Sequence, residues 1–250
     1  MIPYPLDYLN NTTIFTTDEL ESLYGMNQII SLSKFLGNSS YVDKFGMDFI
    51  YTSAQLEGNT YTMNDVLTLL EYGYRARDKP YCDATMIVNM KEAYNLLIHN
   101  NINVTKGTLI EIHRRLFTTD ALHSISQKHL EEGLEILLST YASIDNPFDR
   151  ALYLHCNLAW LHYFKKGNRC TARMMLNVSL KYDGMMIYIP YEQRTVEYLS
   201  AITAYCNTGT YEQFKQYFIH EYAKTAEMIS FVEHAKRQEQ HGAYRRHTVP

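Results

Sequence analysis

One short stretch of this sequence combines a histidine, a tight turn and two arginines. His162 lies near the end of an apolar segment, and Gly167 and Asn168 form a turn behind it. The next segment opens with Arg169 and carries Arg173 one turn further on. The first turn of a helix has backbone N–H groups without acceptors and the positive end of the helix dipole, so it binds anions. Because a neutral histidine beside such a turn can accept a proton from a hydroxyl, the stretch predicts a phosphate site with a general base.

Two apolar helices must hold this stretch in place. Asn146 followed by Pro147 is a strong helix start, and the segment that they open is apolar almost all round to about Tyr163. A helix that is apolar on every face belongs in the middle of a bundle. The following helix is expected to begin at about Cys170. His155, two turns before His162, is interpreted as a buried structural histidine.

Helical periodicity continues through most of the remaining chain. Only 11 glycines and 6 prolines interrupt it, and the best strand-like run is the short segment 185–189. The sequence therefore predicts an all-α fold. Besides the two central helices, we expect helices at about residues 17–32, 42–56, 62–72, 83–98, 105–116, 126–144, 193–207 and 211–235.

The bulk composition excludes several classes of protein. Hydrophobic residues make up 46% of the chain and charged residues 20%, which is typical of a folded globular protein. A formal charge of −4 argues against a general nucleic-acid binder. The four cysteines form no CxxC pair and predict free thiols rather than a disulfide frame or zinc site. No secretory signal and no run of roughly 18 apolar residues is present, so we expect no membrane span and a cytoplasmic location, or export by a route without such a signal.

The stretch from residue 154 to 173 resembles the signature of the Fic (Fido) family. It reads LHCNLAWLHYFKKGNRCTAR, against a family pattern of H-P-F-x-(D/E)-G-N-G-R-x-x-R. Ala151 and His155 match the family's A-x-x-x-H approach to this motif, and Ile112, His113 and Leu116 match its preceding helix. The resemblance implies a helical bundle built on a central helix, an anion-binding loop and a second helix.

A second motif lies upstream. Ser53 to Asn59 reads SAQLEGN and resembles the (S/T)-x-x-x-E-(G/N) motif of the inhibitory helix in one class of the family. The two motifs occur in the expected order, and the resemblance covers roughly residues 45–210. It divides the chain into an N-terminal helical arm (1–44), a Fic-like core with the inhibitory helix (45–210), a C-terminal helix (211–235) and a flexible basic tail (236–250).

The resemblance implies a role for each matching residue. Members of the family mostly transfer AMP from ATP to a hydroxyl of a target protein. His162 would be the general base and Phe164 its buried anchor. Gly167 and Asn168 would form the anion hole, with Arg169 adding positive charge beside it. Arg173 would hold the outer phosphates of ATP.

The upstream motif implies autoinhibition. Glu57, between Ser53 and Gly58 in the motif, would pair with Arg173 and occupy the space that the γ-phosphate needs. An arginine–carboxylate pair is bidentate and geometrically demanding, so it can block productive nucleotide binding.

Four positions depart from the family pattern. Lys166 stands at the acidic position that holds Mg²⁺ in the family, so no metal ligand is assigned and the substitution disfavours the metal. Arg169 replaces a glycine, Cys170 replaces the first arginine and Tyr163 replaces a proline. Segment 117–126 is also too short for an obvious β-hairpin flap, which in the family aligns the target by strand pairing.

The functional hypothesis is a Fic-type protein adenylyltransferase that is autoinhibited by Glu57 and Arg173. Two alternatives stay open. One is a catalytically impaired Fic-fold protein that binds a nucleotide or phosphorylated ligand for regulation, and the other is an enzyme that removes AMP. The expected partners are a nucleotide and an unidentified target protein, without nucleic acid or membrane, and a homo-oligomer stays open.

Overall fold

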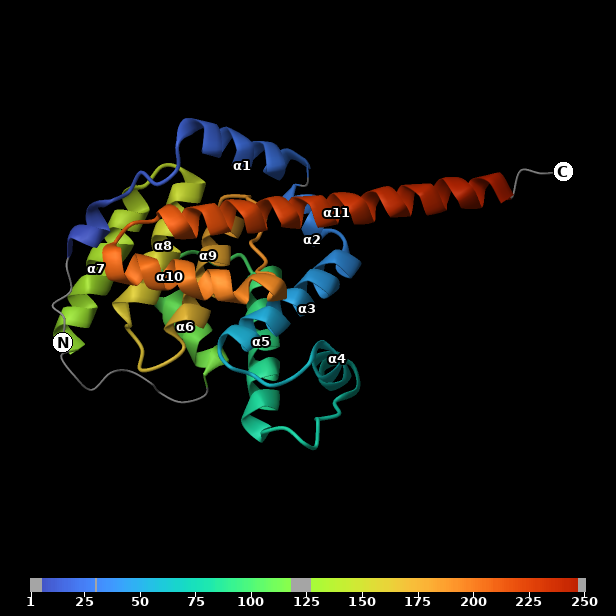
Figure 1. Cartoon of the computed structure of the whole chain (residues 1–250), viewed down its shortest axis with the longest axis horizontal. Coiled ribbons are helices and arrows are strands. Elements are labelled where there is room, and N and C mark those ends of the chain that lie inside the picture. Colours follow the sequence, from blue (N-terminus) through green and yellow to red (C-terminus); the bar gives the residue numbers. More distant parts are fainter. Residues whose placement is uncertain (1–5, 30, 118–126, 247–250) are drawn as a thin grey trace.

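The computed structural model describes the backbone of residues 6–29, 31–117 and 127–246. These residues form an all-α fold, so the predicted class is confirmed (Figure 1). The α-helices are α1 (Thr17–Ile29), α2 (Leu32–Leu36), α3 (Ser39–Leu56), α4 (Met63–Tyr72), α5 (Tyr81–His99), α6 (Lys106–Leu116), α7 (Gln127–Ser143), α8 (Pro147–Leu161), α9 (Asn168–Tyr182), α10 (Thr195–Thr208) and α11 (Glu212–Arg246). A 3₁₀ helix, η1 (Leu6–Asn10), precedes α1, and a second one, η2 (Glu192–Arg194), lies between α9 and α10.

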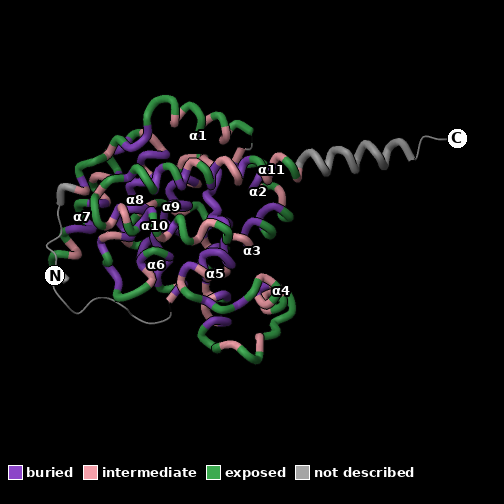
Figure 2. The backbone as a smooth tube through the Cα atoms, in the orientation of Figure 1, coloured by how far each residue is buried: buried purple, intermediate pink, exposed green. Residues whose placement is uncertain are grey.

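Helices α8 and α9 form the centre of the bundle. They pack against each other more extensively than any other pair of helices in the described residues. Both are buried over most of their length, in the middle of the molecule in Figure 2. The Asn146 side chain caps α8 by accepting from the backbone N–H groups of Phe148 and Asp149. The predicted start at Asn146–Pro147 and the predicted central position are therefore confirmed.

The turn between α8 and α9 differs from the prediction at both ends. Helix α8 ends at Leu161 rather than at about Tyr163, because His162 adopts a left-handed conformation with φ 51° and ψ 43°. Helix α9 begins at Asn168 rather than at about Cys170, behind a left-handed Gly167. Periodicity does not detect either change, since each depends on the backbone conformation of a single residue.

The helices around α3 largely follow their capping signals. Thr62 and Asp65 form a reciprocal capping box at the start of α4, as a threonine followed three residues later by a carboxylate predicts. Helix α3 begins three residues earlier than expected, at Ser39. Helix α5 begins at Tyr81 rather than Asp83, because Pro80 is fixed at a φ suited to the N-cap and the Asp83 carboxylate accepts hydrogen bonds from Thr60 instead.

The C-terminal helix corrects another expectation. The sequence suggested a helix to about residue 235 and a flexible basic tail over 236–250, but α11 continues to Arg246. Residues 236–246 are rich in Lys, Arg, Gln, Glu and Ala, which favour helices, and Gly242 alone in this stretch is a weak former. The strand-like run 185–189 forms no strand, and the Asn177 side chain holds it through both polar groups of the Tyr188 backbone. None of the described helices has the length and apolarity that crossing a membrane requires.

Candidate functional site

His162 lies on the turn between α8 and α9 with an exposed side chain. It is the one residue other than glycine with a positive φ among those that the structure describes. A left-handed histidine is uncommon, and such backbone strain occurs preferentially at functional sites. The predicted base is therefore presented to solvent by a backbone conformation that also ends the central helix.

The side chain of Asn168 shapes the same turn. Its Nδ2 donates to the Phe164 carbonyl at 2.7 Å, and its Oδ1 accepts from the Phe164 N–H at 2.9 Å. Both Asn168 and Phe164 are buried. The Asn168 oxygen and one of its two N–H groups are thus bonded within the protein, which fixes the turn that carries the predicted anion site.

Gly167 is required at this position for two reasons. Its φ of +72° favours glycine, and a Cβ would lie 2.0 Å from the ring of Phe117. As the N-cap of α9 it provides no side-chain acceptor for the N–H groups of the first turn. Those groups, in the first turn of a 15-residue helix, are the predicted anion site.

Three cations surround the turn. Lys165, Lys166 and Arg169 are all exposed, and none forms an ion pair with a residue in the described ranges. The Lys166 ammonium lies 5.7 Å from the centre of the Phe117 ring. These charges stay solvated and available to an anionic ligand.

His113 on α6 packs against the turn. It was not identified as a site residue from the sequence. Its ring stacks on Phe164 at 3.5 Å with an angle of 3° between the planes. Its Nδ1 lies 3.0 Å from the hydroxyl of Thr171, which donates to the Gly167 carbonyl. Burial, and then the charge of Lys166, lowers the pKa of His113 to about 4, so the ring is neutral at neutral pH. The sequence signals for His113 were its place on the apolar face of a helix and its match to the helix that precedes the family motif.

Arg173 and Glu57 meet in the interior. The Arg173 Nη2 donates to Glu57 Oε1 at 2.9 Å and to the Ser53 carbonyl at 3.1 Å. The Arg173 side chain is fully buried, whereas the Glu57 side chain is 17% exposed. Glu57 caps the C-terminus of α3, and Gly58 follows in a left-handed conformation at φ 85°. The two motifs, 116 residues apart in sequence, are therefore in direct contact.

Tyr198 completes the surroundings of Arg173 and was also missed by the sequence. Its hydroxyl accepts from Arg173 Nη1 at 3.1 Å and lies 3.3 Å from Nε2 of His155. His155 is buried, as expected, and burial lowers its pKa to about 3. Cys170, at the position of the family's first arginine, is also buried, which raises the pKa of its thiol to about 12. It is therefore a neutral packing group.

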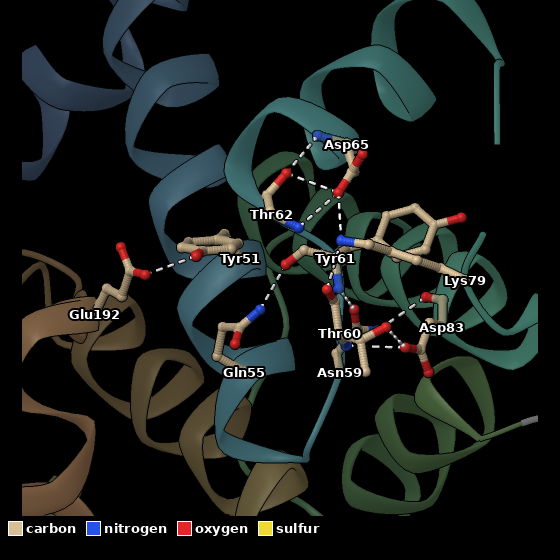
Figure 3. A network of polar contacts seen from close by, with 10 residues as sticks. All are labelled: Tyr51, Gln55, Asn59, Thr60, Tyr61, Thr62, Asp65, Lys79, Asp83 and Glu192. Atoms are coloured by element: carbon tan, nitrogen blue, oxygen red, sulfur yellow. Dashed lines mark hydrogen bonds and ion pairs between the residues drawn. The ribbon is translucent and has the colours of Figure 1, made fainter. Parts of the chain in front are cut away.

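A network of hydrogen bonds fixes the segment that follows Glu57 (Figure 3). The Asn59 side chain donates to the Asp83 carbonyl, and the Asp83 carboxylate accepts from both the N–H and the hydroxyl of Thr60. Gln55 donates to the Tyr61 carbonyl at 2.6 Å. The Gln55 bond joins α3 to the loop that follows it, and the bonds of Asn59 and Thr60 join that loop to α5. The C-terminal end of α3 therefore has a defined position.

The residues of the turn do not fit a magnesium ion. Lys166 replaces the expected carboxylate, and the carboxylate of Glu57 is already paired with Arg173. No group of three or more His, Cys, Asp or Glu side chains in the described part of the chain is arranged to hold a metal. A surface cavity of about 630 Å³ opens elsewhere, between α3, α4 and α5, and includes none of the predicted site residues. The segment 117–126, which the sequence predicts to be too short for a β-hairpin flap, falls almost entirely on residues outside the described ranges.

Residues 103–180 match the family model of the Fic/DOC family. The chain is 24% identical over 196 aligned residues to protein adenylyltransferase fic-1 of Caenorhabditis elegans, covering 68% of this chain and 38% of that protein. It is 26% identical over 159 residues to protein adenylyltransferase Fic of Nematostella vectensis, covering 54% and 37%. The chain thus spans less than half the length of these curated relatives.

Solved structures of Fic proteins share the fold. Fic-1 of Caenorhabditis elegans (residues 134–508) superposes with a TM-score of 0.69 at 19% identity, over 89% of this chain and 70% of that one. A Fic domain containing signaling protein from Bacteroides thetaiotaomicron superposes with a TM-score of 0.66 at 16% identity, over 90% and 93%. The part of the chain that matches the Fic/DOC family model includes the α8–α9 turn, and the solved Fic structures share the fold over about nine-tenths of the chain.

Proposed function

We propose that this protein transfers AMP from ATP to a hydroxyl of a target protein and that Glu57 restrains the reaction. The observation that carries the proposal is the contact of Glu57 with the buried Arg173 guanidinium at 2.9 Å. A buried charge persists only when it is paired, so the guanidinium requires a partner. An ATP phosphate that displaced Glu57 would supply the same negative charge to Arg173.

The chemistry follows from the geometry of the turn. The target hydroxyl attacks the α-phosphorus of ATP while His162 accepts its proton. A new P–O bond forms, the bond from the α-phosphorus to the bridging oxygen breaks, and pyrophosphate leaves. The first N–H groups of α9 hold the α-phosphate, and Lys166 and Arg169 offset the charge of the leaving group. Since the turn does not fit magnesium, the exposed cations must offset the negative charge of the leaving pyrophosphate.

One observation favours a second candidate. Lys166 and Cys170 occupy positions where the family motif has a carboxylate and an arginine. These substitutions support a protein that binds a nucleotide or another phosphorylated ligand for regulation without transferring any group.

The test is incubation with ATP labelled on the α-phosphate, with and without a chelator of divalent metals. We expect Glu57→Gly to increase the labelling of protein and Glu57→Gln to do so less. His162→Ala should lower labelling by about 10²–10⁴-fold, the usual contribution of a general base. His129→Ala is the matched control, since His129 is 79% exposed on α7.

Two outcomes would contradict the proposal. Labelling that survives His162→Ala would exclude this histidine as the base. If Glu57→Gly gives no labelling while ATP still raises the melting temperature, the chain binds nucleotide without transfer.

A further inference from the structure

The loop between α4 and α5 exposes an unusual set of side chains. Tyr72, Tyr74 and Tyr81 are 68%, 71% and 70% exposed. Most tyrosines in the described residues are buried or half-buried. Besides these three, Tyr182 is the only exposed tyrosine whose exposure the structure describes. We refer to residues 72–81 as the Tyr–Arg loop. Exposed tyrosines gathered in one short loop are typical of a protein-binding surface.

The loop also carries two exposed arginines, close in sequence to the exposed Asp78. Arg75 and Arg77 are exposed, and neither forms an ion pair with a residue in the described ranges. The Arg75 guanidinium lies over the Tyr81 ring at 5.0 Å. Lys79, by contrast, pairs with Asp65 at 2.6 Å. Arg75 and Arg77 therefore keep guanidinium groups that can each pair with a carboxylate of a partner.

The Tyr–Arg loop is held in one conformation before any partner arrives. The Lys79 ammonium donates to the Thr60 carbonyl at 2.7 Å as well as to Asp65, and it lies 5.6 Å from the centre of the buried Tyr61 ring (Figure 3). Gly73 turns the chain at the end of α4 with φ +73°. A surface that is already ordered loses less conformational entropy on binding, so two arginines and three tyrosines can support a measurable affinity.

We propose that the Tyr–Arg loop docks an acidic segment of a partner protein. Arg75 and Arg77 pair with its carboxylates, and the tyrosines cover its apolar side chains. Nucleic acid is a poorer fit, because its affinity grows with the number of phosphates that cations neutralise and this loop offers only two arginines without an ion pair to a described residue. The loop and the α8–α9 turn both lie on the lower side of the molecule in Figure 1. Docking itself does not depend on the proposed transfer reaction.

The test uses Cys82 as the position of a reporter. Cys82 is exposed directly after the loop, Cys156 and Cys170 are buried, and Cys206 is half-buried. The full chain with Cys206→Ser is labelled at Cys82 with an environment-sensitive dye and titrated with a short Glu-rich peptide that contains leucine. We expect saturable binding, and a loss of about tenfold or more in affinity for Arg75→Ala with Arg77→Ala, or for Tyr74→Ala.

Matched controls separate the loop from general surface effects. Tyr182→Ala and Arg114→Ala remove an exposed tyrosine and an exposed arginine elsewhere and should leave the affinity unchanged. Absence of saturable binding, or equal affinity of the loop variants and the wild type, would overturn the proposal. Competition by polyadenylate or phosphatidylserine vesicles at lower concentration than the peptide would also overturn it, in favour of those ligands. No nucleotide is present, so the result is independent of the proposed transfer activity.

Discussion

Helix α9 carries two arginines, one turn apart, in opposite surroundings. Arg173 is fully buried and bonded to Glu57, Ser53 and Tyr198, whereas Arg169 is exposed at the turn with no ion pair to a described residue. Burial works against the charged form of Arg173, but Tyr198 and Glu57 more than offset it, so its pKa lies above the usual value. We call Arg173, Glu57, Ser53 and Tyr198 the clasp, because the other three are bonded to Arg173 in the interior. We call the exposed cations of the turn, Lys165, Lys166 and Arg169, the rim. The clasp fixes α3 against α9, and the rim remains available to a ligand.

Replacing the two arginines in turn gives the largest expected contrast. Arg173→Met leaves Glu57 without its partner and should lower the free energy of unfolding by about 3–5 kcal/mol. Arg169→Met should change it by less than about 0.5 kcal/mol, as surface substitutions do. Urea unfolding measures both. Similar losses for the two variants would contradict the distinction between clasp and rim.

The glycines beside the two regions give the next contrast. Gly167→Ala forces a left-handed alanine against the Phe117 ring and should cost about 2–4 kcal/mol of stability. Gly58→Ala, after Glu57, meets open space, so only the backbone strain of about 1–2 kcal/mol remains. Thermal and urea unfolding test the difference. Equal losses would mean that the Phe117 ring yields, and that close packing does not define the turn.

Tyr198 tests how much the clasp depends on its third partner. Tyr198→Phe keeps the ring but leaves the Arg173 Nη1 donor without its acceptor, which should cost about 1–2 kcal/mol of stability. Tyr182→Phe, on an exposed side chain, is the control and should be neutral. If Tyr198→Phe is also neutral, water replaces the hydroxyl and the clasp is less enclosed than its burial indicates.

The two buried histidines predict a dependence of stability on pH. The pKa of His113 falls from 6.5 in the unfolded chain to about 4 in the fold, so the unfolded state binds more protons between these values. Stability is therefore complete above about pH 6.5 and declines as the pH falls toward 4. From pH 7 to 5.5, His113 should account for about 1 kcal/mol. Urea midpoints of the wild type and of His113→Asn across this pH range measure the contribution of His113 to stability. His155 is present in both proteins and contributes in the same direction in each. An equal decline of stability in the two proteins would contradict the predicted contribution of His113.

Local signals in the sequence determined much of the fold. The capping pair Thr62 and Asp65, the start at Asn146–Pro147 and the all-round apolar character of α8 depend on neighbouring residues and on helical spacing. Each is present in the structure for that reason. Resemblance to a family motif, rather than periodicity, suggested Glu57 as the partner of Arg173, and the two are in contact. The inhibitory role of that contact stays a proposal.

Tertiary structure alone decided the rest. His113 stacks on Phe164, and Tyr198 bonds Arg173, from helices whose spacing gives no sign of these contacts. The left-handed conformation of His162 also lies outside what periodicity predicts. The exposure of the Tyr–Arg loop likewise contrasts with the burial of most other tyrosines, although the residue type is the same. Capping and periodicity act within a few residues, so the sequence reveals them directly. Stacking, pairing and exposure depend on which distant segments the packed helices bring together.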